Sequence, residues 1–202
     1  MNQPQIQHLA DAVLGRIFIP LEASARHVHL TEEQVQRLFG KSLTPQRPLS
    51  QPGQYLAAER VTIIGEKGRL ENVAVLGPPR KEAQVEVSMT DCRFLGLNAP
   101  IRQSGDLYDS PGVILEGTCG RIGLQRGVII AQRHLHLTPE AATLFQVKDR
   151  QIVKLRTYTD RPTEFMDVVV RVSPQFATAA HLDFDEANAC GMKPGDLGRI
   201  IP

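Results

Sequence analysis

The sequence lacks the features that mark membrane-spanning and disulfide-stabilised proteins. It contains no tryptophan, only 5% aromatic residues and three cysteines in 202 residues. No apolar run approaches the roughly 20 residues that cross a bilayer. Cys92, Cys119 and Cys190 are far apart with no C-x-x-C pair, and no charged and apolar signal segment opens the chain. We therefore expect a soluble protein of a reducing, cytoplasmic compartment.

The chain also lacks an excess of charge of either sign. Its 23 basic and 22 acidic side chains give a formal net charge of +1. Nucleic acids and anionic membranes attract proteins with a large or clustered positive charge. We expect neither as a partner, and any anion must be recognised locally.

Short β-like runs separated by glycine and proline dominate the chain after Arg26, and helix-period stretches are few. The runs cover residues 60–64, 72–76, 84–88, 112–115, 127–131, 151–157 and 167–172. This pattern predicts a mainly β fold, with barrels or sandwiches capped by short helices, and disfavours repeated βαβ units.

The N-terminal segment has a different pattern. Apolar residues stand at positions 6, 9, 10, 13, 14 and 17, the spacing of one helix face. The spacing predicts a short amphipathic helix, which either packs on its own chain or docks on a partner surface.

A second irregular segment spans residues 40 to 60. It contains Pro45, Pro48, Pro52 and Gly53, which are expected to interrupt regular elements. The segment is either a lid-like excursion over a site or an ordinary surface connection.

One six-residue word occurs twice. Arg26 to Thr31 reads RHVHLT, and Arg133 to Thr138 reads RHLHLT, displaced by 107 residues. Alternate side chains of a strand face the same way, so each word presents two histidines on one face. Each strand should then run into a helix, because Thr31 with Gln34 forms a capping-box pattern and Thr138 precedes a proline. Two matched histidine pairs at strand ends predict two zinc sites.

Each histidine pair needs a further ligand. Glu86 alternates with Val85 and Val87, and it is either a solvated strand glutamate or a metal ligand. His181 would share one face with Asp183 and Asp185 if that segment is extended. His181 is the better zinc ligand, with the aspartates as its hydrogen-bond partners. His8, within the N-terminal segment, has no assigned role.

The chain resembles the PduL-type phosphate propanoyltransferases from about residue 19 to 190. The resemblance rests on the two histidine words and on several further words in matching order. These are QPGQ at 51–54, GPPR at 77–80, QVE at 84–86, RQSGD at 102–106, AQRHLH at 131–136 and HLDFDEANA at 181–189.

The resemblance implies two β-barrel domains with a two-zinc site between them. Barrel one would comprise residues 19–25 and 132–202, and barrel two residues 26–131. Barrel two includes the lid-like segment at about 40–60, and residues 1–18 stand apart. The implied site residues are His27, His29 and Glu86 for one zinc, His134, His136 and His181 for the other, Arg80 for phosphate, and Ser104 and Ala131 for the coenzyme A pocket.

The implied activity is the zinc-dependent exchange of phosphate and coenzyme A on a short acyl group. The substrates and products would be propanoyl-CoA or acetyl-CoA, phosphate, acyl phosphate and CoA. The resemblance further implies a homodimer in the bacterial cytoplasm or inside a bacterial microcompartment. In the second case residues 1–18 would be an encapsulation peptide that contacts shell or lumen proteins.

Two other functions remain open at this stage. Glu33 and Glu140 each follow a histidine pair as H-x-H-x3-E, the arrangement of a metal-dependent bicupin oxygenase or isomerase. The helix starts at Thr31 and Thr138 argue against it, because they would remove the glutamates from the histidine strands. A non-catalytic zinc-stabilised module that binds a scaffold is the other alternative, although structural zinc usually has four protein ligands.

Overall fold

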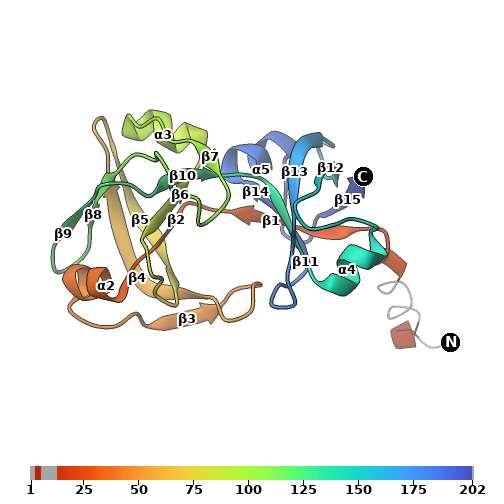
Figure 1. Cartoon of the computed structure of the whole chain (residues 1–202), viewed down its shortest axis with the longest axis horizontal. Helices are drawn as coiled ribbons and strands as arrows, with labels where there is room; N and C mark the ends of the chain where they lie inside the picture. Colours follow the sequence, from red (N-terminus) through yellow and green to blue (C-terminus); the bar gives the residue numbers. More distant parts are fainter. Residues whose placement is uncertain (1–2, 6–12, 202) are drawn as a thin grey trace. The chain divides into compact units, whose positions relative to one another are not determined.

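The computed structural model describes residues 3–5 and 13–201 (Figure 1). The chain divides into two compact units. The barrel unit contains residues 133–182, residues 186–202 and the N-terminal segment up to Ala23. The sheet unit contains residues 24–132 and 183–185. None of the helices within the described residues is long and apolar enough to span a membrane.

The barrel unit is a closed six-stranded barrel in the order β1-β14-β11-β13-β12-β15. The alternation of side chains along a strand gives the barrel wall one buried and one exposed face. Along β12, for example, every second side chain is buried. Its core includes Ile19, Leu135, Leu155 and Leu182. The elements are β1 (Ile19–Ser24), β11 (His134–Leu137), α4 (Pro139–Leu144), β12 (Ile152–Tyr158), β13 (Glu164–Val172), β14 (Ala179–Asp183), α5 (Phe184–Cys190) and β15 (Leu197–Ile201).

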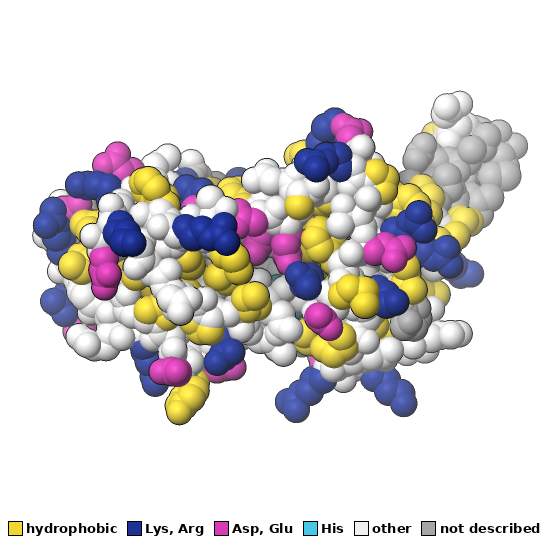
Figure 2. Space-filling model, turned by 90° about the horizontal axis from the view of Figure 1, so that it is seen from above, with side chains coloured by type: hydrophobic (Ala, Val, Ile, Leu, Met, Phe, Trp, Pro, Cys, Tyr) yellow, Lys and Arg dark blue, Asp and Glu magenta, His cyan; other side chains and the backbone are white. Residues whose placement is uncertain are grey.

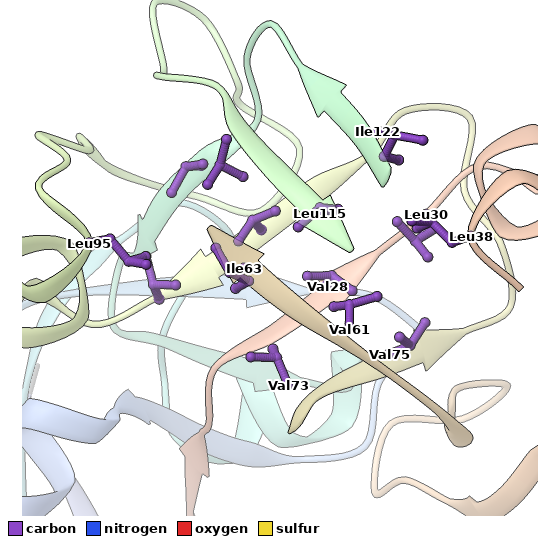
Figure 3. Packing of buried hydrophobic residues seen from close by; sticks show 14 of the residues in the cluster. Val28, Leu30, Leu38, Val61, Ile63, Val73, Val75, Leu95, Leu115 and Ile122 are labelled. Atoms are coloured by element: carbon purple, nitrogen blue, oxygen red, sulfur yellow. The ribbon is translucent and has the colours of Figure 1, made fainter. Parts of the chain in front are cut away.

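The sheet unit is one curled sheet in the order β7-β10-β6-β2-β5-β4-β8-β9, with β3 paired to β4. Figure 3 shows its apolar side chains, among them Val28, Ile63, Val75 and Leu115, gathered between the strands. The elements are β2 (His27–His29), α2 (Glu32–Phe39), β3 (Pro45–Pro48), β4 (Tyr55–Ile64), β5 (Arg69–Gly77), β6 (Gln84–Val87), α3 (Met89–Leu95), β7 (Ile101–Arg102), β8 (Val113–Glu116), β9 (Arg121–Leu124) and β10 (Val128–Ala131).

The mainly β prediction is confirmed. One unit is a closed barrel, whereas the other is an open, curled half-barrel sheet. Each of the seven predicted runs lies in a strand, with ends that differ by a few residues. Both predicted helix starts are also present. Thr31 Oγ1 accepts from Gln34 N while the Gln34 side chain accepts from Thr31 N, and Thr138 Oγ1 accepts from Ala141 N. The histidine strands therefore end where the sequence predicts.

The prolines of residues 40–60 do not keep that segment irregular. Pro45–Pro48 forms β3, which pairs antiparallel with β4, and the segment from Tyr55 onward already belongs to β4. Proline is tolerated in β3 because an edge strand needs ladder hydrogen bonds on one side only. The expectation of interrupted structure was wrong for β3.

Most of the predicted N-terminal helix, residues 6–12 with His8, lies outside the described residues. Val13 and Leu14 are helical, and residues 15–17 form a turn. The side chains of Val13, Leu14 and Ile17 are 49%, 41% and 42% exposed. The apolar residues at this end of the segment thus face solvent in the described chain.

Charge is dispersed over the face shown in Figure 2. Basic and acidic side chains alternate there without gathering by sign. Exposed ion pairs of the chain include Arg126 with Glu82 and Arg156 with Glu164.

Candidate metal sites

The first candidate site lies on two neighbouring strands of the sheet unit. β2 carries His27 and His29, and its antiparallel neighbour β6 places Glu86 directly opposite His27. One donor atom from each of the three residues lies within 4.8 Å of the other two. His27 Nε2 is 3.5 Å from Glu86 Oε1. All three side chains are buried, so the sequence-based alternative of a solvated Glu86 is wrong.

Hydrogen bonding and burial set the protonation of the two histidines. His27 Nδ1 lies 2.7 Å from the Ala25 carbonyl oxygen, which requires Nδ1 to carry the proton and leaves Nε2 facing Glu86. Burial alone would lower the pKa of His27, but Glu86 and the Ala25 carbonyl outweigh it and raise that pKa. Burial, reinforced by charges on His27 and Arg80, lowers the pKa of His29 to about 2. His29 is therefore a neutral imidazole.

The hydrogen bonding of the buried His29 ring and the donor types of the set bear on metal binding. His29 Nδ1 has no hydrogen-bond partner among the described residues. Burying a polar atom without a partner is unfavourable, typically by about 1–3 kcal/mol. Two imidazoles and a carboxylate are also ligands that divalent zinc accepts. The three residues thus fit a metal ion by donor type and spacing.

The second candidate site repeats this arrangement in the barrel unit. His134 and His136 lie on β11, and the antiparallel strand β14 places His181 directly opposite His134. Their donor atoms also lie within 4.8 Å of one another. The three ring centroids are separated by 4.7, 4.7 and 5.0 Å. Glu22 Oε2 is 3.7 Å from His181 Nδ1, a position from which it can orient that ring.

The two sites share one local topology. Each histidine strand has a parallel neighbour on one side, β5 or β13, and an antiparallel neighbour that carries the third donor, β6 or β14, on the other. A helix follows each histidine strand and each third-donor strand. The repeated word therefore marks a repeated piece of structure, and the third donor faces the first histidine in both copies.

Of the two aspartates near His181, Asp183 shares its strand as expected and Asp185 does not. β14 ends at Asp183, and Asp185 lies in the helix α5. Asp185 Oδ2 accepts a hydrogen bond from Thr90 N instead of sharing a strand face with His181. The expectation of one extended polar face was wrong because the chain turns helical at Phe184.

A hydrogen-bond network joins Arg80 to the first site. Arg80 Nη1 donates to Ser104 Oγ at 3.2 Å, and Gln84 Nε2 donates to the same oxygen at 2.8 Å. Gln84 Nε2 also lies 2.5 Å from Glu86 Oε1, while Gln84 Oε1 accepts from Gly105 N. Sequence reasoning missed Gln84, although its place two residues before Glu86 on one strand puts both on the same face.

Ala131 ends β10, the parallel neighbour of β6. Ile129, two residues earlier on β10, pairs with Glu86, and Ala131 itself pairs with Arg102 of β7. Ala131 is buried. The structure thus places Ala131 on a strand next to the first site and Ser104 within the network that reaches it.

The glutamates of the bicupin alternative lie away from the histidine strands. Glu33 is the second residue of α2 and Glu140 the second of α4, and both are exposed. Neither belongs to a donor group among the described residues. The helix starts at Thr31 and Thr138 thus exclude the H-x-H-x3-E ligand set.

Comparison with known proteins identifies related chains over almost the whole length. The family model for phosphate propanoyltransferase matches residues 20–193. A phosphate propanoyltransferase of Clostridioides difficile (strain 630) is 48% identical over 202 residues, covering 97% of each chain. One from Listeria monocytogenes is 48% identical over 207 residues, covering 100% of this chain and 97% of the relative. One from Thermotoga maritima is 50% identical over 181 residues, covering 88% and 86%.

Proposed function

This chain belongs to the phosphate propanoyltransferase family, and from that membership and its two donor sets we propose that it is a zinc-dependent phosphate acyltransferase. It would interconvert propanoyl-CoA or acetyl-CoA and phosphate with the acyl phosphate and CoA. The observation that carries the proposal is the pair of matched three-donor sets, each with two histidines on one strand and a third donor opposite. Three protein ligands are typical of catalytic zinc, which keeps a position open.

The residues that would hold the metals are His27, His29 and Glu86 for one ion, and the three histidines 134, 136 and 181 for the other. When bound, zinc would stabilise the departing thiolate and the negative charge on the acyl oxygen. Glu86 would also partly neutralise the first ion, whereas the second set is formally neutral. The two ions would therefore differ in net charge at their sites.

Arg80 would hold and orient phosphate. Its guanidinium offers a fork of donors that matches two phosphate oxygens, and its contact with Ser104 fixes one edge of that fork. Arg80 N also donates to the Leu30 carbonyl, which ties this residue to the segment that follows β2. Support for the phosphate role thus comes from the network that links Arg80 to the metal ligand Glu86.

In the reaction, a phosphate oxygen attacks the thioester carbonyl carbon. The new C–O bond forms, the C–S bond breaks, and its electron pair leaves with sulfur as the CoA thiolate. The chain's part is to hold a phosphate oxygen against the face of the thioester carbonyl carbon. Ser104 and the backbone at Ala131 would line the CoA pocket. The reverse reaction uses the same groups, so concentrations set the direction.

The family resemblance also supports proposals on assembly. The domains would be residues 19–25 with 132–202, and residues 26–131; the chain would form a homodimer in the bacterial cytoplasm. Residues 1–18 would direct it into a bacterial microcompartment by contacting shell or lumen proteins, which the exposed Val13, Leu14 and Ile17 favour. Deleting residues 1–18 should abolish co-localisation with shell proteins, and unchanged co-localisation would refute this role.

The catalytic proposal is tested by measuring CoA release from propanoyl-CoA with and without phosphate. We expect release to require phosphate, to be lost after treatment with a chelator, and to return when zinc is added. Acetyl-CoA, assayed in parallel, measures the acyl preference. Release that proceeds equally without phosphate, or that survives complete metal removal, would contradict the proposal.

A further inference from the structure

The arginine of the repeated word has the same kind of partner in both units. Arg26 Nη2 lies 2.9 Å from Asp91 Oδ1, and Arg133 Nη1 lies 2.5 Å from Glu186 Oε1. The two acidic side chains are only 5% and 16% exposed. Each arginine directly precedes the first histidine of its pair, and each acid stands five positions after the third donor. The repeat thus includes, besides the proposed metal ligands, an ion pair formed by other residues.

The strand directions explain why these residues meet. The third-donor strand runs antiparallel to the histidine strand, so its end lies beside the start of the histidine strand. At that end β6 leads into α3, with Asp91 in its first turn, and β14 leads into α5, with Glu186 in its first turn. Each arginine therefore bridges the start of the histidine strand and the helix that continues the donor strand.

One partner of each ion pair is held by a further contact. Asp91 Oδ2 accepts from Ser88 N in the capping box of α3. Arg133 Nε donates to the Met166 carbonyl, and its guanidinium lies 5.9 Å from the centre of the Phe165 ring. An ion pair with one partner already held loses less side-chain entropy when it forms, and its partial burial reduces screening by salt. Such a pair can hold two backbone segments in register.

We propose that Arg26 and Arg133 are positioning residues, each of which holds the third donor against one histidine pair and so tightens one metal site. This inference rests on the proposed function, because it requires the two donor sets to bind metal. The arginines do not touch the metal. They fix the strand ends on which Glu86 and His181 stand. Because they act through the backbone, their effect on metal affinity should fall at the lower end of the about 10–100-fold range seen for groups that hydrogen-bond a ligand directly.

Zinc affinity, measured by competition with a chromophoric chelator, tests the inference without an activity assay. Replacing His134 and His136 by alanine leaves only the sheet-unit donors. In that background we expect Arg26→Ala to weaken zinc binding by about tenfold and Arg26→Lys to retain part of the affinity. Arg126→Ala, which breaks an exposed pair of the same unit, should change it by less than about twofold.

The barrel-unit site provides the mirror experiment. Replacing His27 and His29 by alanine leaves only the three histidines of that unit. Arg133→Ala should weaken zinc binding there by a similar factor, while Arg156→Ala, which removes an exposed pair with Glu164, should not. Arg26→Ala should leave the zinc affinity of the barrel-unit site unchanged. Arg133→Ala should likewise leave the zinc affinity of the sheet-unit site unchanged.

Asp91→Asn serves as a second variant at the first site. If the pair acts as a unit, Arg26→Ala combined with Asp91→Asn should weaken zinc binding by less than the product of the two single effects. Unchanged zinc affinity in Arg26→Ala and Arg133→Ala, or losses confined to variants whose metal-free circular dichroism shows an unfolded chain, would overturn the positioning role alone. A wild-type chain that binds no zinc would overturn both the metal assignment and this inference.

Discussion

His181 lies directly opposite His134 across the antiparallel strands β14 and β11, with their rings stacked at 5.0 Å. The same register places Glu86 opposite His27 in the other unit. In both cases a strand from later in the chain supplies the donor that the histidine pair lacks. The two sites are therefore complete only after long-range strand pairing.

Loss of a third donor should remove one metal and leave the other. We expect Glu86→Ala or His181→Ala to lower the bound zinc from two ions per chain to about one, because two protein ligands seldom hold catalytic zinc. Elemental analysis of the dialysed protein measures this. Glu71→Ala, a change at a 69% exposed side chain, is the control. Two zinc ions retained in both site variants would refute the ligand assignment.

Replacement of Arg80 should affect phosphate more than the thioester. Arg80→Lys keeps the charge but loses the planar fork, so we expect the KM for phosphate to rise about tenfold or more. The KM for propanoyl-CoA should change by less than about twofold. Steady-state kinetics with each substrate varied measures both constants. Lys81→Ala, at the exposed neighbouring position, should resemble the wild type, and an unchanged phosphate KM in Arg80→Lys would contradict the role of Arg80.

Gln84 should increase the zinc affinity of the first site, although it is not one of the proposed ligands. Gln84→Met preserves the side-chain volume but removes the hydrogen bonds to Glu86, Ser104 and Gly105. Gln84→Glu instead places a second carboxylate beside Glu86. We expect both changes to weaken zinc binding at that site by about tenfold or more, as measured by chelator competition. The exposed Gln125→Met is the matched control, and equal affinities in all three variants would refute the effect.

Glu59 should contribute to stability above about pH 4.5. Burial alone would raise its pKa, but Lys41 Nζ at 2.8 Å and two hydrogen bonds from Thr44 outweigh burial and lower the pKa to about 2. A carboxyl whose pKa is lower in the folded chain stabilises it above the unfolded value. That contribution is lost as the pH falls from about 4.5 to 2.

We therefore expect Glu59→Gln to reduce the free energy of unfolding by about 1–3 kcal/mol at pH 7. The difference from the wild type should shrink below about pH 4.5 and vanish near pH 2. Urea denaturation at several pH values measures it. Glu71→Gln, at an exposed position, should show no such dependence. A Glu59→Gln difference that stays constant down to pH 2 would contradict this assignment.

The sequence by itself determined the local features of the protein. Alternation in the two RHxHLT words places His27 with His29 and His134 with His136 on one strand face. Thr31 and Thr138 then end those strands by capping a helix. These features depend on neighbours within a few residues, so periodicity and capping preferences are sufficient to predict them.

The tertiary structure decided which distant residues join those pairs. From alternation alone, Glu86 could equally be a solvated glutamate, and His181 was expected to share a strand face with Asp185. Only the antiparallel pairing of β6 with β2 and of β14 with β11 buries Glu86 and sets each donor opposite a histidine. Strand register arises from side-chain packing between segments far apart in sequence, and the contacts of Arg26 with Asp91 and of Gln84 with Ser104 arise in the same way.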